Sequence, residues 1–600
     1  MDTVVNDLNT VLIYVCFALS LNLIQGYAGL VSVAHAAFGA VGGYTIGYLF
    51  LHGGHALIWP GLALGVALAA FAGFLVGLPA LRLKTEWLLL LTLAVQTIVL
   101  LAVVNFKQLG ASYGLQNVSP FFLTPGKELD LPQDMLPLFL GAAILIFLLC
   151  FRMGESPYGR VLNGIREDEI ACRSLGKNVF AYKLQVFSIT AGMAGLAGAL
   201  LVINNGLSSP QLFDFQQSTA MVAMVIVGGA GNLWGTLLGV VLLTILQPIL
   251  QTTFKLSSSQ AADAQLIAFG VALVIVLMVR PGGILPDRTT RTARKNMRQL
   301  ESLKAGSLSA ALPSADKLRH DVSYAAPDRP ESARAIVQSN GAVAAAGREV
   351  VLKVTGLSKR FGGIVAADSL DIELRAGHIT ALVGPNGAGK TTVFNLLTGA
   401  IAPDAGTVLL RGEEIVGMTP DAITRRGMAR SFQNVRIFAR LSVLDNVMLG
   451  IQKQPGERLG PLFLNPGGVH RFETAARKRA MDWLGFVGMT EYKDLPAGAL
   501  AFGQQKLVAL ARVLATEADV VLLDEPASGI DHQWVDVMLS LIDDIRKEGR
   551  TVCIVEHNLH VVDRLADHTY FMELGKITAQ GNFAELTSDK RLAEAYFGTA

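Results

Sequence analysis

The sequence predicts a multidomain chain in which an all-α polytopic membrane domain is followed by an α/β P-loop domain. The chain has 600 residues, of which 52% are hydrophobic and only 16% charged, whereas about one-quarter of a soluble protein is charged. Charges are sparse up to about residue 280 and frequent after about residue 286. A phosphate-binding motif follows an apolar run in the charged half. The two halves are therefore expected to fold in lipid and in water.

Composition excludes several classes of protein. The net charge of +2 argues against a nucleic-acid-binding face. The four cysteines are far apart in the sequence and form no C-x-x-C pair, so neither a metal site nor a disulfide framework is expected. Cys16 and Cys150 lie in apolar runs and are expected to be core residues. Asp2 and Asp7 without any Lys or Arg make a poor signal-peptide start.

Apolar stretches of spanning length predict the transmembrane helices. They cover about 10–31, 33–51, 56–81, 87–107, 135–151, 184–204 and 264–279. Lys and Arg mark the loops at 82–84, at 152–183 and after 280 as cytoplasmic, whereas 108–134 carries balanced charge and is expected to be external. A further stretch, 219–250, is broken at Gly228–Asn232. To keep the flanking loops on their assigned sides of the membrane, this stretch should cross it twice. We therefore favour a hairpin of two short helices there and about nine passes, with the N-terminus outside. The alternative is one kinked helix.

Three other features of this half carry expectations. Small residues crowd the spans at 36–47 and 191–198, which permits close helix contact. The cytoplasmic loop 152–183 has helical composition over 160–175, with Gly176 suited to a C-terminal cap. Such a helix could transmit movement from an ATPase to the membrane domain, although a charged connector explains it equally well. His35 either lines a path through the membrane or is a satisfied structural residue.

These observations divide the chain into three parts. We expect a transmembrane domain of 8–9 spans over 1–285, a linker over 286–349 and a P-loop domain over 350–600. The linker is rich in Ala, Ser, Arg and Pro and shows no sustained apolar period, so it is expected to be a flexible tether.

A P-loop carries the chemistry of the second half. The strand-like run Ile379–Val383 precedes a complete G-x-x-x-x-G-K-[ST] motif, and a helical segment at Thr392–Thr398 follows. Backbone amides and the helix N-terminus of such a loop bind phosphates. Lys390 is expected to reach the terminal phosphates and the Thr391 hydroxyl to bind Mg²⁺. The expected ATP-binding residues of the loop are Gly384, Pro385, Asn386, Gly387, Ala388, Gly389, Lys390, Thr391 and Thr392.

Two carboxylates follow a second buried strand. The continuous apolar run Val520–Leu523 is typical of a parallel strand buried on both faces, and it ends in Asp524 and Glu525. Beside a P-loop, Asp524 is expected to hold Mg²⁺ through water and Glu525 to polarise the attacking water.

At this point the sequence resembles the ABC ATPases. Leu500, Ala501, Phe502, Gly503 and Gln504 stand at the family's signature loop, which acts in trans on a partner's nucleotide. The resemblance implies an adenine-stacking Phe361, a Q-loop Gln433 that senses the permease and joins Thr391 and Asp524 around Mg²⁺, a D-loop Asp531 and a switch His557. Ala501 and Phe502 depart from the family's Ser and Gly. A lost hydroxyl contact costs about 0.5–1.5 kcal/mol, so a weakened signature is expected.

Both halves resemble one subgroup, the branched-chain amino-acid importers. The permease resemblance rests on Ala28–Gly39, Ser156–Gly176 and Arg280–Leu285, and that of the ATPase on Phe432–Phe438 and Glu556–Asn558. It implies a natural fusion of one permease and one ATPase, with ATP and Mg²⁺ as cofactors. It also implies a coupling helix at 156–176 docked near the Q-loop. The resemblance further implies three partners: a second permease, a second ATPase and an extracytoplasmic binding protein. It also implies an inner-membrane location with a cytoplasmic ATPase domain.

Two rival functions differ in class. An ABC exporter half-transporter shares the order of the halves, but its long cytoplasmic helices and six passes fit poorly. A membrane-tethered ATPase that acts as a sensor would not need a coupling loop beside a Q-loop. Within the importer class, urea, short amides and aromatic acids are alternative substrates.

Overall fold

The fold is described from a computed structural model. It covers residues 2–53, 58–83, 85–118, 121–124, 127–129, 131–253, 257–280, 282–287 and 349–588. Within these residues, 2–166 and 179–287 form one compact unit, and 167–178 and 349–588 form a second. The predicted linker lies outside the described residues, except at its two ends.

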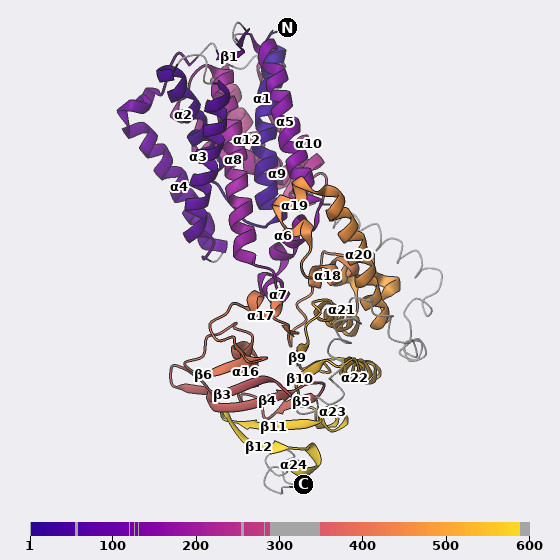
Figure 1. The fold of residues 1–600 in the computed structure, drawn as a ribbon. Coiled ribbons are helices and arrows are strands. Elements are labelled where there is room, and N and C mark those ends of the chain that lie inside the picture. The colour runs from indigo at the N-terminus through magenta and orange to yellow at the C-terminus, as the bar shows by residue number, and fades with distance from the viewer. Residues whose placement is uncertain are drawn as a thin grey trace, which may run out of the picture. The chain divides into compact units, whose positions relative to one another are not determined.

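The first unit is helical, as the sequence predicts. Figure 1 shows most of its long helices running side by side. A π-helical turn, Leu23–Tyr27, and an irregular segment at 28–34 separate the first two helices, and a short hairpin of β1 (Phe121–Thr124) and β2 (Lys127–Leu129) precedes α5. The helices are α1 (Asp2–Asn22), α2 (His35–Gly53), α3 (Ile58–Ala80), α4 (Thr85–Asn105), α5 (Pro132–Gly154), α6 (Pro157–Glu167), α8 (Val179–Asn205), α9 (Phe215–Gly228), α10 (Leu233–Thr244), α11 (Leu246–Thr253) and α12 (Ser258–Val279).

Six segments of the described residues are long and apolar enough to cross a membrane. They are Val4–Tyr27, Ile58–Ala80, Trp87–Asn105, Pro132–Gly154, Val179–Asn205 and Leu233–Gln251. The expected count of about nine also needs α2, α9 and α12, which are shorter or less apolar than these six.

The broken stretch 219–250 forms a hairpin. A Cβ on Gly228 would lie 2.2 Å from Gly235 O, and one on Gly239 would lie 2.2 Å from Met224 O. These pairs run in opposite chain directions, so α9 and α10 pack antiparallel. Asn232 caps α10 by accepting a hydrogen bond from Gly235 N at 3.0 Å. The hairpin interpretation is confirmed, and the kinked-helix alternative is wrong.

Small residues bring helix backbones into direct contact. A Cβ on Gly42 would lie 2.0 Å from Gly195 O, and one on Gly198 would lie 2.0 Å from Gly39 O. Helices α2 and α8 therefore cross with no room for a side chain between them, the use of small residues that lipid-embedded helices favour.

The helix expected over 160–175 is two helices, which corrects the prediction. Helix α6 ends at Glu167 and α7 covers Glu169–Ser174. Asp168 between them has an extended backbone (φ −154°), and its carboxylate accepts a hydrogen bond from Ala171 N at 2.9 Å. An aspartate in this position starts a new helix rather than continuing the old one. Gly176 is left-handed (φ +78°) just after α7, as a C-terminal cap requires.

The second unit contains two sheets. One sheet has the order β12-β11-β5-β10-β9-β8, parallel except for β12, and the other is antiparallel with the order β4-β3-β6-β7. The strands are β3 (Val350–Phe361), β4 (Ile364–Arg375), β5 (Ile379–Val383), β6 (Ala405–Leu410), β7 (Glu413–Glu414), β8 (Met428–Arg430), β9 (Val520–Asp524), β10 (Thr551–Val555), β11 (His568–Glu573) and β12 (Lys576–Gly581). The helices are α16 (Lys390–Leu397), α17 (Pro420–Arg425), α18 (Val443–Gly450), α19 (Leu459–Leu464), α20 (Pro466–Phe486), α21 (Phe502–Leu514), α22 (His532–Lys547), α23 (Leu559–Leu565) and α24 (Phe583–Ser588).

The parallel sheet is buried on both faces. Val521 and Leu523 of β9 belong to a core that includes residues of α21 and α22, whereas Val520 and Leu522 belong to a core with α16 and the antiparallel sheet. Alternate residues of a strand point to opposite faces, so a strand between two cores must be apolar throughout. This is the physical reason for the continuous apolar run in the sequence.

Candidate functional site

The candidate site lies at the carboxyl edge of the parallel sheet. Strands β5, β10, β9 and β8 are neighbours and run in the same direction. Their carboxyl ends therefore meet at one edge, where ligands of such sheets bind. The P-loop follows β5, His557 follows β10, Asp524 and Glu525 stand at the end of β9, and Gln433 follows β8.

The P-loop wraps the start of α16. Gly384 (φ +153°) and Gly389 (φ +107°) have backbone conformations that L side chains rarely adopt, and a Cβ on either would lie within 2.2 Å of a carbonyl oxygen. The Lys390 ammonium donates hydrogen bonds to Gly384 O at 2.7 Å and Pro385 O at 2.9 Å. Burial lowers the pKa of Lys390, and the nearby Glu525 and Asp524 charges oppose that shift. The predicted phosphate loop is thus present at the amino end of a helix.

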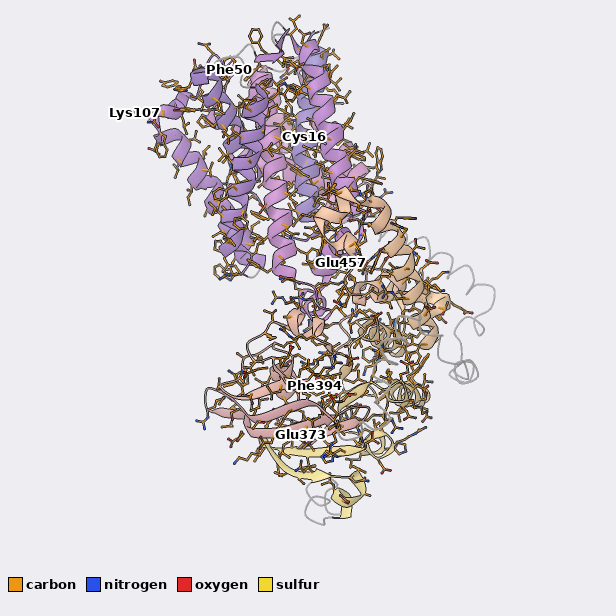
Figure 2. The ribbon with its side chains drawn as sticks, in the orientation of Figure 1. Cys16, Phe50, Lys107, Glu373, Phe394 and Glu457 are labelled. Carbon is orange, nitrogen blue, oxygen red and sulfur yellow. The ribbon has the colours of Figure 1, made fainter. Side chains whose placement is uncertain are left out.

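Asp524 forms a buried ion pair with Arg430, a residue that sequence reasoning missed. Arg430 Nη2 donates to Asp524 Oδ2 at 2.7 Å, and the two side chains are 4% and 1% exposed. Its other terminal nitrogen donates to Asn395 at 2.6 Å. The guanidinium lies 5.4 Å from the ring centres of both Phe394, labelled in Figure 2, and Phe432. The signal that could have found Arg430 is a cation at the end of a strand adjacent to β9.

Burial opposes ionisation of this pair. Desolvation raises the pKa of Asp524, and the Arg430 charge counteracts that rise. Desolvation also lowers the pKa of Arg430, against the attraction of Asp524. The Arg430 charge therefore offsets part of the cost of burying the Asp524 carboxylate.

Glu525, Gln433 and His557 come together beside it, as the sequence predicts. Gln433 Nε2 donates to Glu525 Oε2 at 3.0 Å, and His557 Nδ1 lies 3.7 Å from Glu525 Oε1. Glu525 has a left-handed backbone (φ +47°). Residues other than glycine adopt this conformation at a cost, and such strain is concentrated at functional sites.

Lys506 and Glu556 hold the segment that follows Glu525, and sequence reasoning missed both. Lys506 Nζ donates to the carbonyls of Glu525 at 2.9 Å and Ser528 at 2.5 Å. The fully buried Glu556 accepts a hydrogen bond from Ala527 N at 3.1 Å. Burial lowers the pKa of Lys506 and raises that of Glu556, and the attraction of Glu556 for Lys506 opposes the Lys506 shift.

The other predicted residues lie on separate elements. Phe361 ends β3 and is 45% exposed, and Asp531 precedes α22 and is also exposed. Helix α21 begins at Phe502, within the predicted signature loop; Ala501 stands at its N-cap, and Ala501 N donates to Gln504 Oε1 at 3.1 Å. Ala501 lacks the hydroxyl that would cap this helix.

Two membrane-unit residues singled out by the sequence are buried. All four cysteines are buried and free, and Cys16, labelled in Figure 2, lies within α1. His35 at the start of α2 is 1% exposed, and its two ring nitrogens have no hydrogen-bond partner among the described residues. The role of His35 stays a prediction.

The residues around Asp524 fit a hydrated Mg²⁺. Asp524 Oδ1 is buried without a hydrogen-bond partner in the described residues, so one carboxylate oxygen is free to accept from a metal-bound water. Thr391 is exposed at the start of α16, and Gln433 contacts Glu525 through its Nε2, so its amide oxygen is not used in that contact. Hydroxyl, carboxylate and amide oxygens are the donors that Mg²⁺ prefers.

A P-loop at this edge, with a carboxylate pair and a glutamine around it, defines a nucleotide-binding ATPase. Comparison with known proteins is consistent with this class. Residues 367–528 match the family model described as ABC transporter, and residues 3–277 match the model described as branched-chain amino acid transport system, permease component.

Relatives of the second half are branched-chain amino acid transport ATP-binding proteins. BraF of Pseudomonas aeruginosa is 36% identical over 252 residues, which is 42% of this chain and 98% of BraF. LivG of Escherichia coli is 35% identical over 251 residues, 42% of this chain and 98% of LivG. The crystal structure of a nucleotide-free ATP-binding cassette is 29% identical and covers 42% of this chain and 100% of that one, with a TM-score of 0.37.

This chain belongs to the ABC transporter family. It joins a permease domain and an ABC ATPase domain in one polypeptide. It is an integral membrane protein whose cytoplasmic domain binds nucleotide and hydrolyses ATP.

Proposed function

We propose that this chain is one permease–ATPase half of an importer for branched-chain amino acids or related small solutes in the inner membrane. The observation that carries the proposal is the match of residues 3–277 to the permease component of branched-chain amino acid transport. The names of BraF and LivG support the same class for the ATPase half. The working complex would add a second permease, a second ATPase and an extracytoplasmic binding protein.

The site residues divide the work of hydrolysis. The amides of the P-loop from Gly384 to Thr392 and the Lys390 ammonium would hold the phosphates, with Phe361 stacked on adenine. Thr391, Gln433 and Asp524 would hold Mg²⁺, which supplies charge neutralisation on the phosphates when bound.

Glu525 would accept a proton from the attacking water. Its contact with Gln433 at 3.0 Å would orient the carboxylate. His557 lies beside the other carboxylate oxygen, where it would contact the γ-phosphate and so distinguish ATP from ADP. The loop Leu500–Gln504 would complete the partner's site in trans, with Asp531 of the D-loop beside it.

The carboxylate role is tested by Glu525→Gln in the assembled complex. Glutamine keeps the contact with Gln433 but cannot take the proton, so steady-state hydrolysis should fall by about 10²–10⁴-fold with ATP binding intact. Glu573→Gln, on an exposed residue of the same unit, is the control. Unchanged turnover in Glu525→Gln removes Glu525 from this role.

The substrate is tested with the extracytoplasmic binding protein that this proposal requires. Calorimetry should show tight binding of leucine, isoleucine or valine, and the assembled complex in vesicles should take up the same solute. Binding of urea, a short amide or an aromatic acid instead would refute the amino-acid assignment.

A further inference from the structure

The segment 167–178, which we name the connector, folds as part of the ATPase unit although it lies in the chain between α6 and α8. Three ATPase side chains donate to its backbone carbonyls: Thr424 to Ser174 O at 3.1 Å, Gln452 to Leu175 O at 2.7 Å and Arg425 to Gly176 O at 2.9 Å. Because every residue has a backbone carbonyl, these hydrogen bonds would hold any connector with this backbone conformation, whatever its side chains.

One contact does depend on a connector side chain and is buried. Lys177 Nζ donates to Glu457 Oε1 at 2.6 Å and to Ile451 O at 3.0 Å. The side chains of Lys177 and Glu457 are 3% and 10% exposed. Glu457, labelled in Figure 2, ends the short 3₁₀ turn Pro455–Glu457 just before α19. A buried charge that loses its partner is strongly destabilising.

The second charge pair of the connector is more exposed, so the loss of one partner should cost less. Asp168 lies 2.8 Å from Arg436, but their side chains are 19% and 37% exposed. Water can solvate either group if the other is replaced, and exposed pairs contribute little. Lys177–Glu457 is thus the better placed of the two pairs to reject a mismatched connector.

We propose that the buried Lys177–Glu457 pair selects the connector that this ATPase accepts and matches the ATPase to its own chain's permease. This inference rests on the proposed function, because a transporter with two permeases presents two connectors to two ATPases. A connector with an acidic residue at position 177 would bring a second carboxylate against the buried Glu457, and an ATPase without Glu457 would leave the buried Lys177 ammonium without this carboxylate. Either mismatch is a means of rejecting a partner.

Charge reversal tests the pair in the full chain within its complex. Lys177→Glu and Glu457→Lys should each reduce uptake by about tenfold or more, which corresponds to about 1.4 kcal/mol. The reversed pair K177E/E457K, or the apolar pair K177M/E457M, should restore uptake to within about threefold of wild type, because neither leaves a lone buried charge. Reversal of the exposed pair Lys353–Glu373, at 55% and 39% exposure, is the control and should change nothing.

Two variant chains expressed together test whether the match is within one chain. A mixture of Lys177→Glu chains and Glu457→Lys chains should stay inactive, since neither chain carries a matched pair. Recovery of uptake in the mixture would mean that the ATPase accepts another chain's connector. The proposal also fails if either single variant is fully active, or if both double variants stay as inactive as the singles.

Trypsin provides a readout that does not need transport. Lys177 should resist cleavage in the wild-type chain and become a cleavage site in Glu457→Met, with ATP binding as the control for folding. Equal cleavage at Lys177 in both proteins overturns the inference. If the wild type shows the expected protection but transports no branched-chain amino acid, the proposed function fails and the docking of the connector stands.

Discussion

Replacement of Arg430 by methionine should destabilise the ATPase unit by about 3–5 kcal/mol, the usual cost of leaving a buried charge without its partner. The structure shows why Asp524 depends on Arg430. Asp524 is 1% exposed, its Oδ1 has no hydrogen-bond partner among the described residues, and its Oδ2 would lose the bond from Arg430. Asn395 would lose its bond from the same guanidinium.

Thermal unfolding of the purified full chain measures this change, with the fluorescence of Trp483 and Trp534 reporting the ATPase unit. In a unit of this size, about 1 kcal/mol shifts the midpoint by about 2–4 °C, so Arg430→Met should lower it by about 6–20 °C. Arg411→Met is the matched control, because Arg411 pairs with Asp519 in an exposed position and should cost about 1 kcal/mol or less.

A double variant separates the ion pair from simple loss of packing. Arg430→Met combined with Asp524→Asn removes both charges, so it should recover a large part of the lost stability. A shift of less than about 2 °C for Arg430→Met would refute the reasoning. So would a double variant that is less stable than Arg430→Met alone.

Three further predictions concern other parts of the chain. Gly42→Ala should destabilise the membrane unit by about 1–3 kcal/mol, because its Cβ would lie 2.0 Å from Gly195 O, whereas Gly141→Ala, with nothing within 4 Å, should be neutral or stabilising; thermal melts in detergent measure both. Ala501→Ser restores the N-cap of α21 and should add about 0.5–2 kcal/mol, seen as a higher melting midpoint, and an unchanged midpoint would contradict the capping argument. Burial raises the pKa of Glu556, so the native state binds its proton more tightly than the unfolded chain, and this contribution to stability is lost as pH rises through the folded pKa. Glu556→Gln does not titrate; its midpoint relative to wild type should therefore increase with pH and level off, and a pH-independent difference would exclude the effect.

Local sequence determined much of this protein. Apolar runs of spanning length predicted the membrane helices, and the break at Gly228–Asn232 predicted the hairpin of α9 and α10, because a turn in lipid needs small and polar residues over a short distance. The run Ile379–Val383 followed by a P-loop fixed the position of β5 and α16, since phosphate binding requires glycines, a lysine and a helix start in one order. These patterns are local, so they can be recognised without knowledge of the fold.

Tertiary structure alone decided the partners. Arg430 and Asp524 are 94 positions apart in the sequence, and Lys177 and Glu457 are 280 apart. No local pattern marks such pairs, because a charge is read as exposed until the packing that buries it is known. The break at Asp168 and the assignment of residues 167–178 to the ATPase unit have the same cause. The carbonyls and charges of this segment are partnered by residues more than 200 positions away, so its place depends on the fold of the whole chain.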